Sequence, residues 1–138
     1  MVALQVKTTT TRTRFTLGEK NEATSEATNE WYALVGFDST EPPPSYYLLP
    51  RNHVAVLIYL HHRVWLTKSA KNGTPHQDTS RRAIEAKNIA GGEGGWDRLL
   101  EPTCGIALRL SPYYSEIFDE AEALGIHPPS PVPAIECA

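Results

Sequence analysis

The chain has 138 residues, of which 41% are hydrophobic and 21% are charged. This length and balance fit one globular domain, because single domains cluster at about 100–150 residues. No run approaches the roughly 18 apolar residues of a membrane span, and the N-terminus lacks the order of a secretory signal, so we expect a cytoplasmic protein. The net charge of −3 excludes a molecule-wide basic field that would attract nucleic acid. Cys104 and Cys137 lie far apart without a partner motif, so we expect two reduced thiols.

The first part of the chain predicts one strand and one weak helix. Between residues 2 and 10, Val2, Leu4 and Val6 alternate with alanine, glutamine and lysine, which is the pattern of a half-buried strand. Residues 11–17 are either the return strand of a hairpin or a loop. Residues 18–30 are polar and have almost no apolar stripe, which indicates a short exposed helix.

A pair of strands and a long helix are expected next. Residues 31–37 (WYALVGF) form a continuous apolar run, typical of a central strand covered on both faces. The prolines at 42–44 force a loop before a second strand at 46–49. From residue 52 to residue 66 the apolar residues recur at intervals of three and four, which predicts an amphipathic helix after Pro50, capped by Asn52.

The second half carries fewer regular signals. Residues 67–95 are polar, and their GGEGG stretch cannot hold a stable helix or strand. A short helix is expected to begin near Trp96. Ser111 and Pro112 open a final helix, which Gly125 ends. The order strand, helix, strand, strand, helix indicates an α/β or α+β domain.

Several motifs follow one another in an order that is informative as a set. They are Gln5-Val6-Lys7 on the first strand, WYALVGF, YYLLPRNHVAVLI, HHRVWL, KNGTPHQD with Arg82, and WDRLL. Their order and spacing resemble one branch of the PD-(D/E)XK nuclease-like superfamily over residues 3–100. The resemblance implies a restriction-endonuclease-like mixed sheet flanked by helices. Residues 1–110 would be a partial nuclease-like domain, and residues 111–138 a C-terminal helix with a proline-rich tail.

The chain departs from this family at its beginning. Domains of this kind start with a helix and two strands, the second of which carries the motif aspartate. Here four residues precede Gln5 and none of them is acidic. We therefore expect either a truncated chain that is entered at the lysine strand, or a degenerate relative that has lost catalysis.

The resemblance implies Mg²⁺-dependent hydrolysis of DNA. The opening strand would lie in the middle of the sheet and aim Gln5 and Lys7 at one pocket, because alternate strand positions share a face. The Gln5 amide oxygen would be a neutral metal ligand, with Lys7 beside the attacking water. Glu22 is a further candidate metal ligand, although a solvated helical face is the more ordinary explanation for it. Without an opposing aspartate, we expect this chain by itself to be incomplete or inactive.

Basic residues are the candidates for contacts with DNA phosphates, although ordinary surface solubility is the more common explanation for them. The candidates are Arg12, Arg14, Lys20, Lys71 and Arg82, followed by Lys68 and Arg81.

The histidines suggest a weaker metal hypothesis. His61 and His62 are adjacent on the expected helix and point about 100° apart, so they cannot easily chelate one metal together. His61 lies on the apolar stripe, so we expect it to be buried and hydrogen-bonded to the loop of His76 and Asp78. A histidine-based hydrolase is therefore the least favoured hypothesis.

The alternative function is a non-catalytic protein-interaction module. A sheet that lacks its N-terminal strand has an unpaired edge. Such an edge can be completed by oligomerisation or by a strand from a partner chain.

Overall fold

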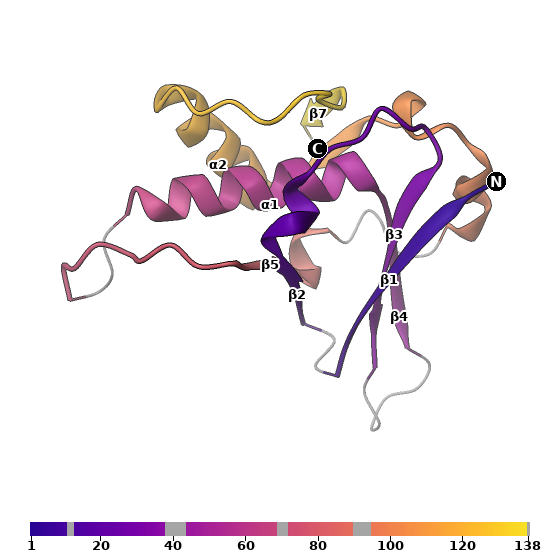
Figure 1. Cartoon of the computed structure of the whole chain (residues 1–138), viewed down its shortest axis with the longest axis horizontal. Coiled ribbons are helices and arrows are strands. Elements are labelled where there is room, and N and C mark those ends of the chain that lie inside the picture. Colours follow the sequence, from indigo (N-terminus) through magenta and orange to yellow (C-terminus); the bar gives the residue numbers. More distant parts are fainter. Residues whose placement is uncertain (11–12, 38–43, 69–71, 90–94, 138) are drawn as a thin grey trace.

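The computed structural model describes residues 1–10, 13–37, 44–68, 72–89 and 95–137. These residues form an α+β structure, as predicted (Figure 1). Its elements are β1 (Ala3–Thr9), β2 (Arg14–Gly18), β3 (Glu30–Gly36), β4 (Ser45–Pro50), α1 (Arg51–Leu66), β5 (Arg81–Glu85), β6 (Leu108–Leu110), α2 (Pro112–Ala123) and β7 (Ile135–Cys137). Short 3-10 helices occupy Glu19–Glu22, Ala86–Asn88, Trp96–Leu100 and Thr103–Gly105.

A mixed sheet of β1, β3 and β4 holds β3 in its centre. β1 pairs with β3 in parallel, and β4 pairs with β3 antiparallel. Tyr32 and Leu34 of β3 enter the main hydrophobic core, whereas Trp31 and Ala33 enter a smaller core on the opposite face. The mixed sheet and the central strand covered on both faces are therefore confirmed.

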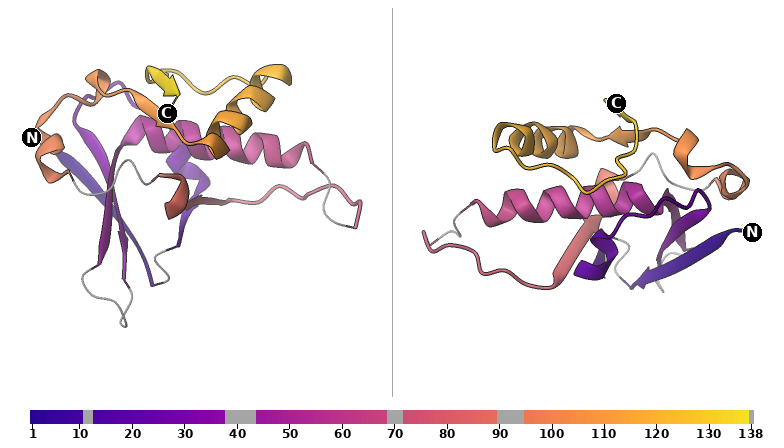
Figure 2. Two further views of the ribbon diagram at one scale, coloured as in Figure 1. Left: turned by 180° about the vertical axis from the view of Figure 1, so that it is seen from behind. Right: turned by 45° about the horizontal axis from the view of Figure 1, so that its top comes forward.

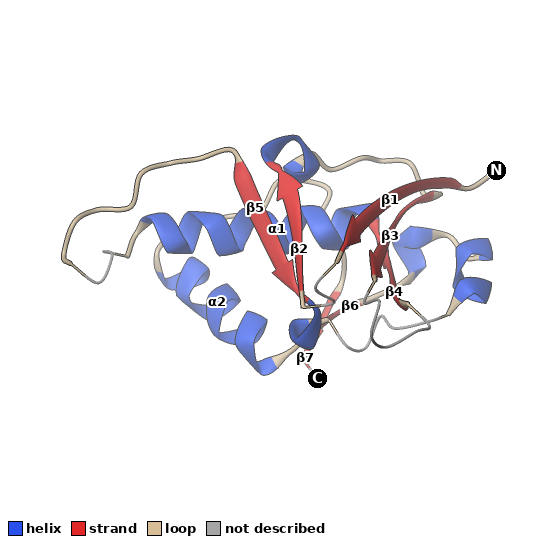
Figure 3. Cartoon of the chain, turned by 90° about the horizontal axis from the view of Figure 1, so that it is seen from below, coloured by secondary structure: helices blue, strands red, loops and turns tan. Residues whose placement is uncertain are grey.

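β1 lies at the edge of this sheet, which corrects the prediction that the opening strand is central. Among the described strands, β3 is the only ladder partner of β1. β2 contacts β1 but forms no ladder with it, and the two strands diverge towards the N-terminal end of β1 (Figures 1 and 3). Within the described part of the chain, no strand therefore pairs with the other edge of β1 near residues 2–6.

A separate antiparallel ladder joins β2 to β5. Phe15 faces Ile84 across this ladder, and both side chains are fully buried in the main core. The sequence left residues 11–17 as a strand or a loop and expected no strand within 67–95. The strand β5 was missed because its composition is polar, and its partner β2 lies far away in the sequence.

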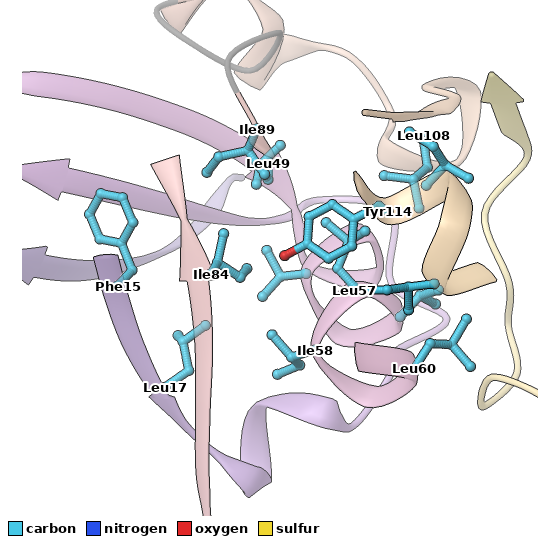
Figure 4. Packing of buried hydrophobic residues seen from close by; sticks show 14 of the residues in the cluster. Phe15, Leu17, Leu49, Leu57, Ile58, Leu60, Ile84, Ile89, Leu108 and Tyr114 are labelled. Atoms are coloured by element: carbon cyan, nitrogen blue, oxygen red, sulfur yellow. The ribbon is translucent and has the colours of Figure 1, made fainter. Parts of the chain in front are cut away.

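α1 is the centre of the main core. It lies between α2 and the β2–β5 ladder (Figures 2 and 3), and its Leu57 and Ile58 are almost fully buried. Figure 4 shows side chains from β2, β5, α1 and α2 gathered in this core. The predicted cap is wrong, because the helix begins at Arg51 and its N-cap residue is Pro50, without a side-chain cap hydrogen bond. The Asn52 side chain instead bonds the backbone of Ser25 at 2.9 and 2.8 Å.

α2 begins where the sequence predicts. Ser111 caps it by accepting a hydrogen bond from the Tyr114 N–H, and Pro112 occupies the first turn. Gly125 follows the helix with a φ of 72°, a conformation that glycine adopts without strain. Tyr114, Ile117 and Ala121 pack into the same core as α1, so the C-terminal helix and the preceding residues share one hydrophobic interior.

The remaining expectations are met in part. Residues 18–30 form a 3-10 helix only at Glu19–Glu22, since no apolar stripe holds a longer helix against the core. The short helix near Trp96 is present as the 3-10 helix Trp96–Leu100. Neither α-helix in the described part of the chain combines the length and apolarity needed to cross a bilayer.

Candidate functional site

Gln5 and Lys7 share one face of β1, as their alternate positions predict. Gln5 lies opposite Tyr32 and Lys7 opposite Leu34 in the parallel ladder. Paired residues point to the same side of a sheet, so both side chains lie on the face that Tyr32 and Leu34 direct into the main core. Lys7 is half-buried there and Gln5 is exposed.

The opposite face of β1 carries apolar side chains that remain in solvent. Leu4 is 40% exposed and Val6 is 54% exposed, and Val2 has the same orientation. A strand with one free edge and exposed apolar residues is an unusual surface, because an unpaired edge can pair with another chain. β1 thus presents a polar face with Gln5 and Lys7, an apolar face, and an open edge between them.

Arg82 and Glu22 form a buried ion pair. The Arg82 Nε lies 2.8 Å from a Glu22 carboxylate oxygen and Nη2 lies 3.3 Å from the other oxygen. The Arg82 Nη1 donates to the backbone oxygen of Thr79 at 2.6 Å, and the Arg82 side chain is only 3% exposed. A buried arginine needs such partners, since an unpaired charge in the interior is costly.

These contacts give both residues different partners from those that the sequence predicted. Arg82 was a candidate phosphate contact, but its guanidinium joins β5 to the 3-10 helix Glu19–Glu22. Glu22 was a candidate metal ligand, but its carboxylate is the counter-ion of Arg82. Lys20 is exposed on the same 3-10 helix, whereas Arg12 and Lys71 lie outside the described residues.

A cavity of about 540 Å³ lies where β5 meets the C-terminal half of α1. Figure 3 shows β5 as the ladder strand nearer that end of the helix. The cavity brings together three predicted phosphate contacts, Arg14 from β2 and the distant Arg81 and Arg82 from β5. Its lining consists of Arg14, Thr16, His61, His62, Trp65, Thr79, Arg81, Arg82 and Ala83.

The histidines beside this cavity are arranged differently from the prediction. His62, not His61, is the buried residue that bonds to Asp78, with a distance of 2.7 Å from Nε2 to the carboxylate. His61 instead lies 2.8 Å from the Tyr113 hydroxyl of α2. The apolar periodicity of the helix predicted the wrong histidine as the buried one. Adjacent helix positions point about 100° apart, so a small error in the expected buried face exchanges His61 and His62.

Stacking fixes the loop that follows α1. The Trp65 ring stacks on His76 with centroids 4.0 Å apart, and His62 stacks on Trp65 at 5.5 Å. The hydrogen bond from His62 lowers the pKa of the Asp78 carboxyl. Trp65 therefore holds His76 of the following loop against the helix.

The pKa of His61 is lowered by its surroundings. Burial is the largest cause that lowers the pKa of His61, and His62 and Arg14 lower it further. His61 is thus favoured in its neutral form beside a cavity that holds arginine side chains.

A comparison of the chain with protein families, curated proteins and solved structures finds no match in any of the three. The relation to nucleases therefore remains an expectation from the sequence motifs. Within the described residues, no three histidine, cysteine or acidic side chains are grouped so that they could hold a metal ion. The geometry provides a lysine and an amide on one strand face, an open strand edge beside them, and a separate cavity with arginines.

Proposed function

We propose that this chain is a nuclease-like protein that acts on DNA. Its β1 strand would supply Gln5 and Lys7 to a magnesium site, and a strand added beside β1 would supply the acidic ligand. The observation that carries the proposal is the arrangement of β1. Its open edge lies between the face with Gln5 and Lys7 and the face with exposed Leu4 and Val6. The same proposal places the protein in the cytoplasm.

Metal chemistry explains why a second strand is required. Mg²⁺ prefers oxygen ligands and is normally held by one or two carboxylates. The Gln5 amide offers a neutral oxygen, and the Glu22 carboxylate is committed to Arg82. An acidic side chain on a strand beside β1 would supply the missing negative charge, and Lys7 would orient the attacking water.

Strand addition also explains the apolar face. An added strand would bond to the N–H and C=O groups along the outer edge of β1 near residues 2–6. Its alternate side chains would point to opposite faces, so one set would cover Leu4 and Val6 while the other set would lie beside Gln5 and Lys7. A strand that alternates apolar and acidic residues fits both faces.

The test uses a defined strand. The purified chain is mixed with Mg²⁺, supercoiled plasmid, and a synthetic peptide in which valine alternates with aspartate. We expect cleavage with this peptide and little without it, and a peptide of valine alternating with serine is the control. Lys7→Ala should abolish cleavage, whereas Lys87→Ala, which alters an exposed lysine elsewhere, should retain it.

Two outcomes would overturn the proposal. One is the absence of Mg²⁺-dependent cleavage both with the peptide and in any self-associated form of the protein. The other is equal cleavage by the Lys7→Ala and Lys87→Ala variants, because the lysine on β1 would then have no part in the reaction.

A second candidate function is a non-catalytic module that pairs with a copy of itself. One observation favours it. The exposed apolar residues Val2, Leu4 and Val6 are arranged symmetrically about Leu4. If two β1 strands paired antiparallel about Leu4, each Val2 would lie opposite Val6 of the other copy, and the two Leu4 side chains would meet. No like-charged side chains would face each other at these positions.

Sedimentation separates this candidate from the first. A self-pairing module should dimerise without DNA or metal, and Leu4→Lys should make it monomeric. Leu124→Lys is the matched control, since Leu124 is 53% exposed after α2. A strict monomer at the highest soluble concentration would exclude the self-pairing function and leave the first proposal in place.

A further inference from the structure

Most acidic side chains around the β2–β5 ladder already have a hydrogen-bond or ion-pair partner. Glu22 pairs with Arg82, and Glu19 lies 3.9 Å from the same guanidinium. Asp78 pairs with His62. Glu85 lies opposite Arg14 in the ladder, but its carboxylate pairs with Lys87 at 3.4 Å.

Two arginines of the ladder remain without an ion pair among the described residues. Arg14 and Arg81 are both exposed, and both line the cavity of about 540 Å³. They lie on the ladder face opposite to Phe15 and Ile84, because alternate residues of a strand point to opposite sides. This face therefore carries positive charge that the protein itself does not neutralise.

Their separation suits an extended anion. Arg81 lies opposite Gly18, four positions along β2 from Arg14. At about 3.4 Å per residue, the two Cα atoms are roughly 14 Å apart along the ladder. A lone phosphate ion is much smaller than this spacing, whereas a nucleic-acid strand carries a phosphate at each nucleotide.

An exposed threonine lies between the two arginines on the ladder. Thr16 lies on the same ladder face and, like His61, lines the cavity. Hydroxyl groups and arginines are common partners of backbone phosphates. The ladder face thus offers a hydrogen-bonding group between two guanidinium groups.

Another cavity among the described residues is less suited to a polyanion. It has a volume of about 680 Å³ and is lined by Lys87, Arg98 and Arg109. Lys87 and Arg109 pair with Glu85 and Glu136, and the Arg98 guanidinium lies over the Trp31 ring. Its exposed cations are therefore engaged within the protein.

We propose that the β2–β5 ladder is a binding surface for a nucleic-acid backbone, with Arg14 and Arg81 contacting different phosphates. Arg82 is not one of the proposed phosphate contacts, because its guanidinium is paired with Glu22 and holds β5 in place. The inference rests on the proposed function only in that nucleic acid is the ligand. It requires neither Mg²⁺ nor an added strand.

Binding is tested with fluorescein-labelled oligonucleotides, single-stranded and duplex, by anisotropy across a series of salt concentrations. Each removed phosphate contact should lower the salt slope by about 0.7 for single strands and about 0.9 for duplex DNA. We expect Arg14→Gln and Arg81→Gln each to weaken binding several-fold with such a change of slope. Arg109→Gln is the matched control, because the Arg109 side chain is 77% exposed on a different surface, and it should bind like the unmodified protein.

Further arms identify the ligand. An oligonucleotide with a terminal phosphate should bind as well as one without, because internal diesters make the contacts. Polyglutamate should compete weakly; equal competition would show that the surface recognises any polyanion and would overturn the inference. Equal binding by Arg14→Gln, Arg81→Gln and Arg109→Gln, or no binding of any oligonucleotide, would overturn it as well.

The two proposals can fail separately. If Arg14→Gln and Arg81→Gln weaken binding but no DNA is cleaved under any condition, the binding surface stands and the nuclease proposal falls. Circular dichroism of each variant checks that the fold is intact.

Discussion

Arg82 and Glu22 lie 60 positions apart in the sequence, and their side chains meet with a distance of 2.8 Å between Nε and Oε2. Their side chains are 3% and 13% exposed, respectively. This contact joins β5 to the 3-10 helix Glu19–Glu22, which directly follows β2. It therefore holds one end of the β2–β5 ladder together. Two residues that the sequence assigned to DNA and metal binding thereby stabilise the surface that we propose for DNA.

Glu22→Gln should destabilise the protein strongly. Removing one member of a buried ion pair leaves the other charge without compensation, which costs about 3–5 kcal/mol. The free energy of unfolding, measured with urea, should fall by about this amount. Glu19→Gln is the control, because the Glu19 side chain is 65% exposed at 3.9 Å from Arg82 and should change stability by about 1 kcal/mol or less. Equal effects of the two substitutions would show that the Glu22 pair is not buried in solution.

The buried His53 should make stability depend on pH. Burial lowers the pKa of His53 from 6.5 to about 4, and its Nε2 lies 2.9 Å from the backbone oxygen of Ile106. Above pH 6.5 this histidine is neutral in both the folded and the unfolded state. As the pH falls from 6.5 towards 4, only the unfolded state takes up the proton, so the folded state loses stability.

Between pH 7 and pH 4.5 the loss should amount to about 2 kcal/mol, because pH 4.5 lies about two units below the pKa in the unfolded state and one pKa unit corresponds to about 1.4 kcal/mol. Urea unfolding at pH 7 and pH 4.5 measures it. His53→Gln should flatten the part of the pH dependence that belongs to this residue, whereas the exposed His127 can be changed to Gln without this effect. An NMR titration in which His53 protonates near its ordinary pKa would contradict the prediction.

Tyr114→Ala should show that α2 belongs to the same cooperative unit as α1. The Tyr114 side chain is 2% exposed and packs in the main core, and loss of a buried aromatic residue costs about 3–5 kcal/mol. Chemical denaturation should report this loss in a single transition. Leu124→Ala, at a position that is 53% exposed, should have little effect. Two separate transitions would mean that residues 111–138 fold apart from the rest.

Ser111→Ala should remove the cap of α2. The Ser111 hydroxyl accepts a hydrogen bond from the Tyr114 N–H at 3.3 Å, and replacement of such a cap by alanine typically costs about 1 kcal/mol. Ser111→Asp should retain stability, since aspartate is an equally good cap. Thermal unfolding of both variants compares them directly. A Ser111→Asp protein as unstable as Ser111→Ala would show that the side-chain acceptor does not stabilise the helix.

The sequence by itself determined the elements that depend on near neighbours. The apolar run at residues 31–37 indicated the buried strand β3, and the spacing of residues such as Leu57 and Ile58 indicated α1. Ser111 and Pro112 marked the start of α2 for the same reason, because a cap acts within one turn. The alternation of β1 was also sufficient to put Gln5 and Lys7 on one face.

Only the tertiary structure decided which distant segments meet. β5 is a strand because β2 pairs with it, and its own residues gave no such signal. The position of β1 at a sheet edge, the contact of Arg82 with Glu22, and the choice of His62 over His61 as the partner of Asp78 all depend on packing between segments far apart in the chain. Periodicity describes how a segment distributes its side chains, but the partner that each side receives is set by the three-dimensional packing of the whole core.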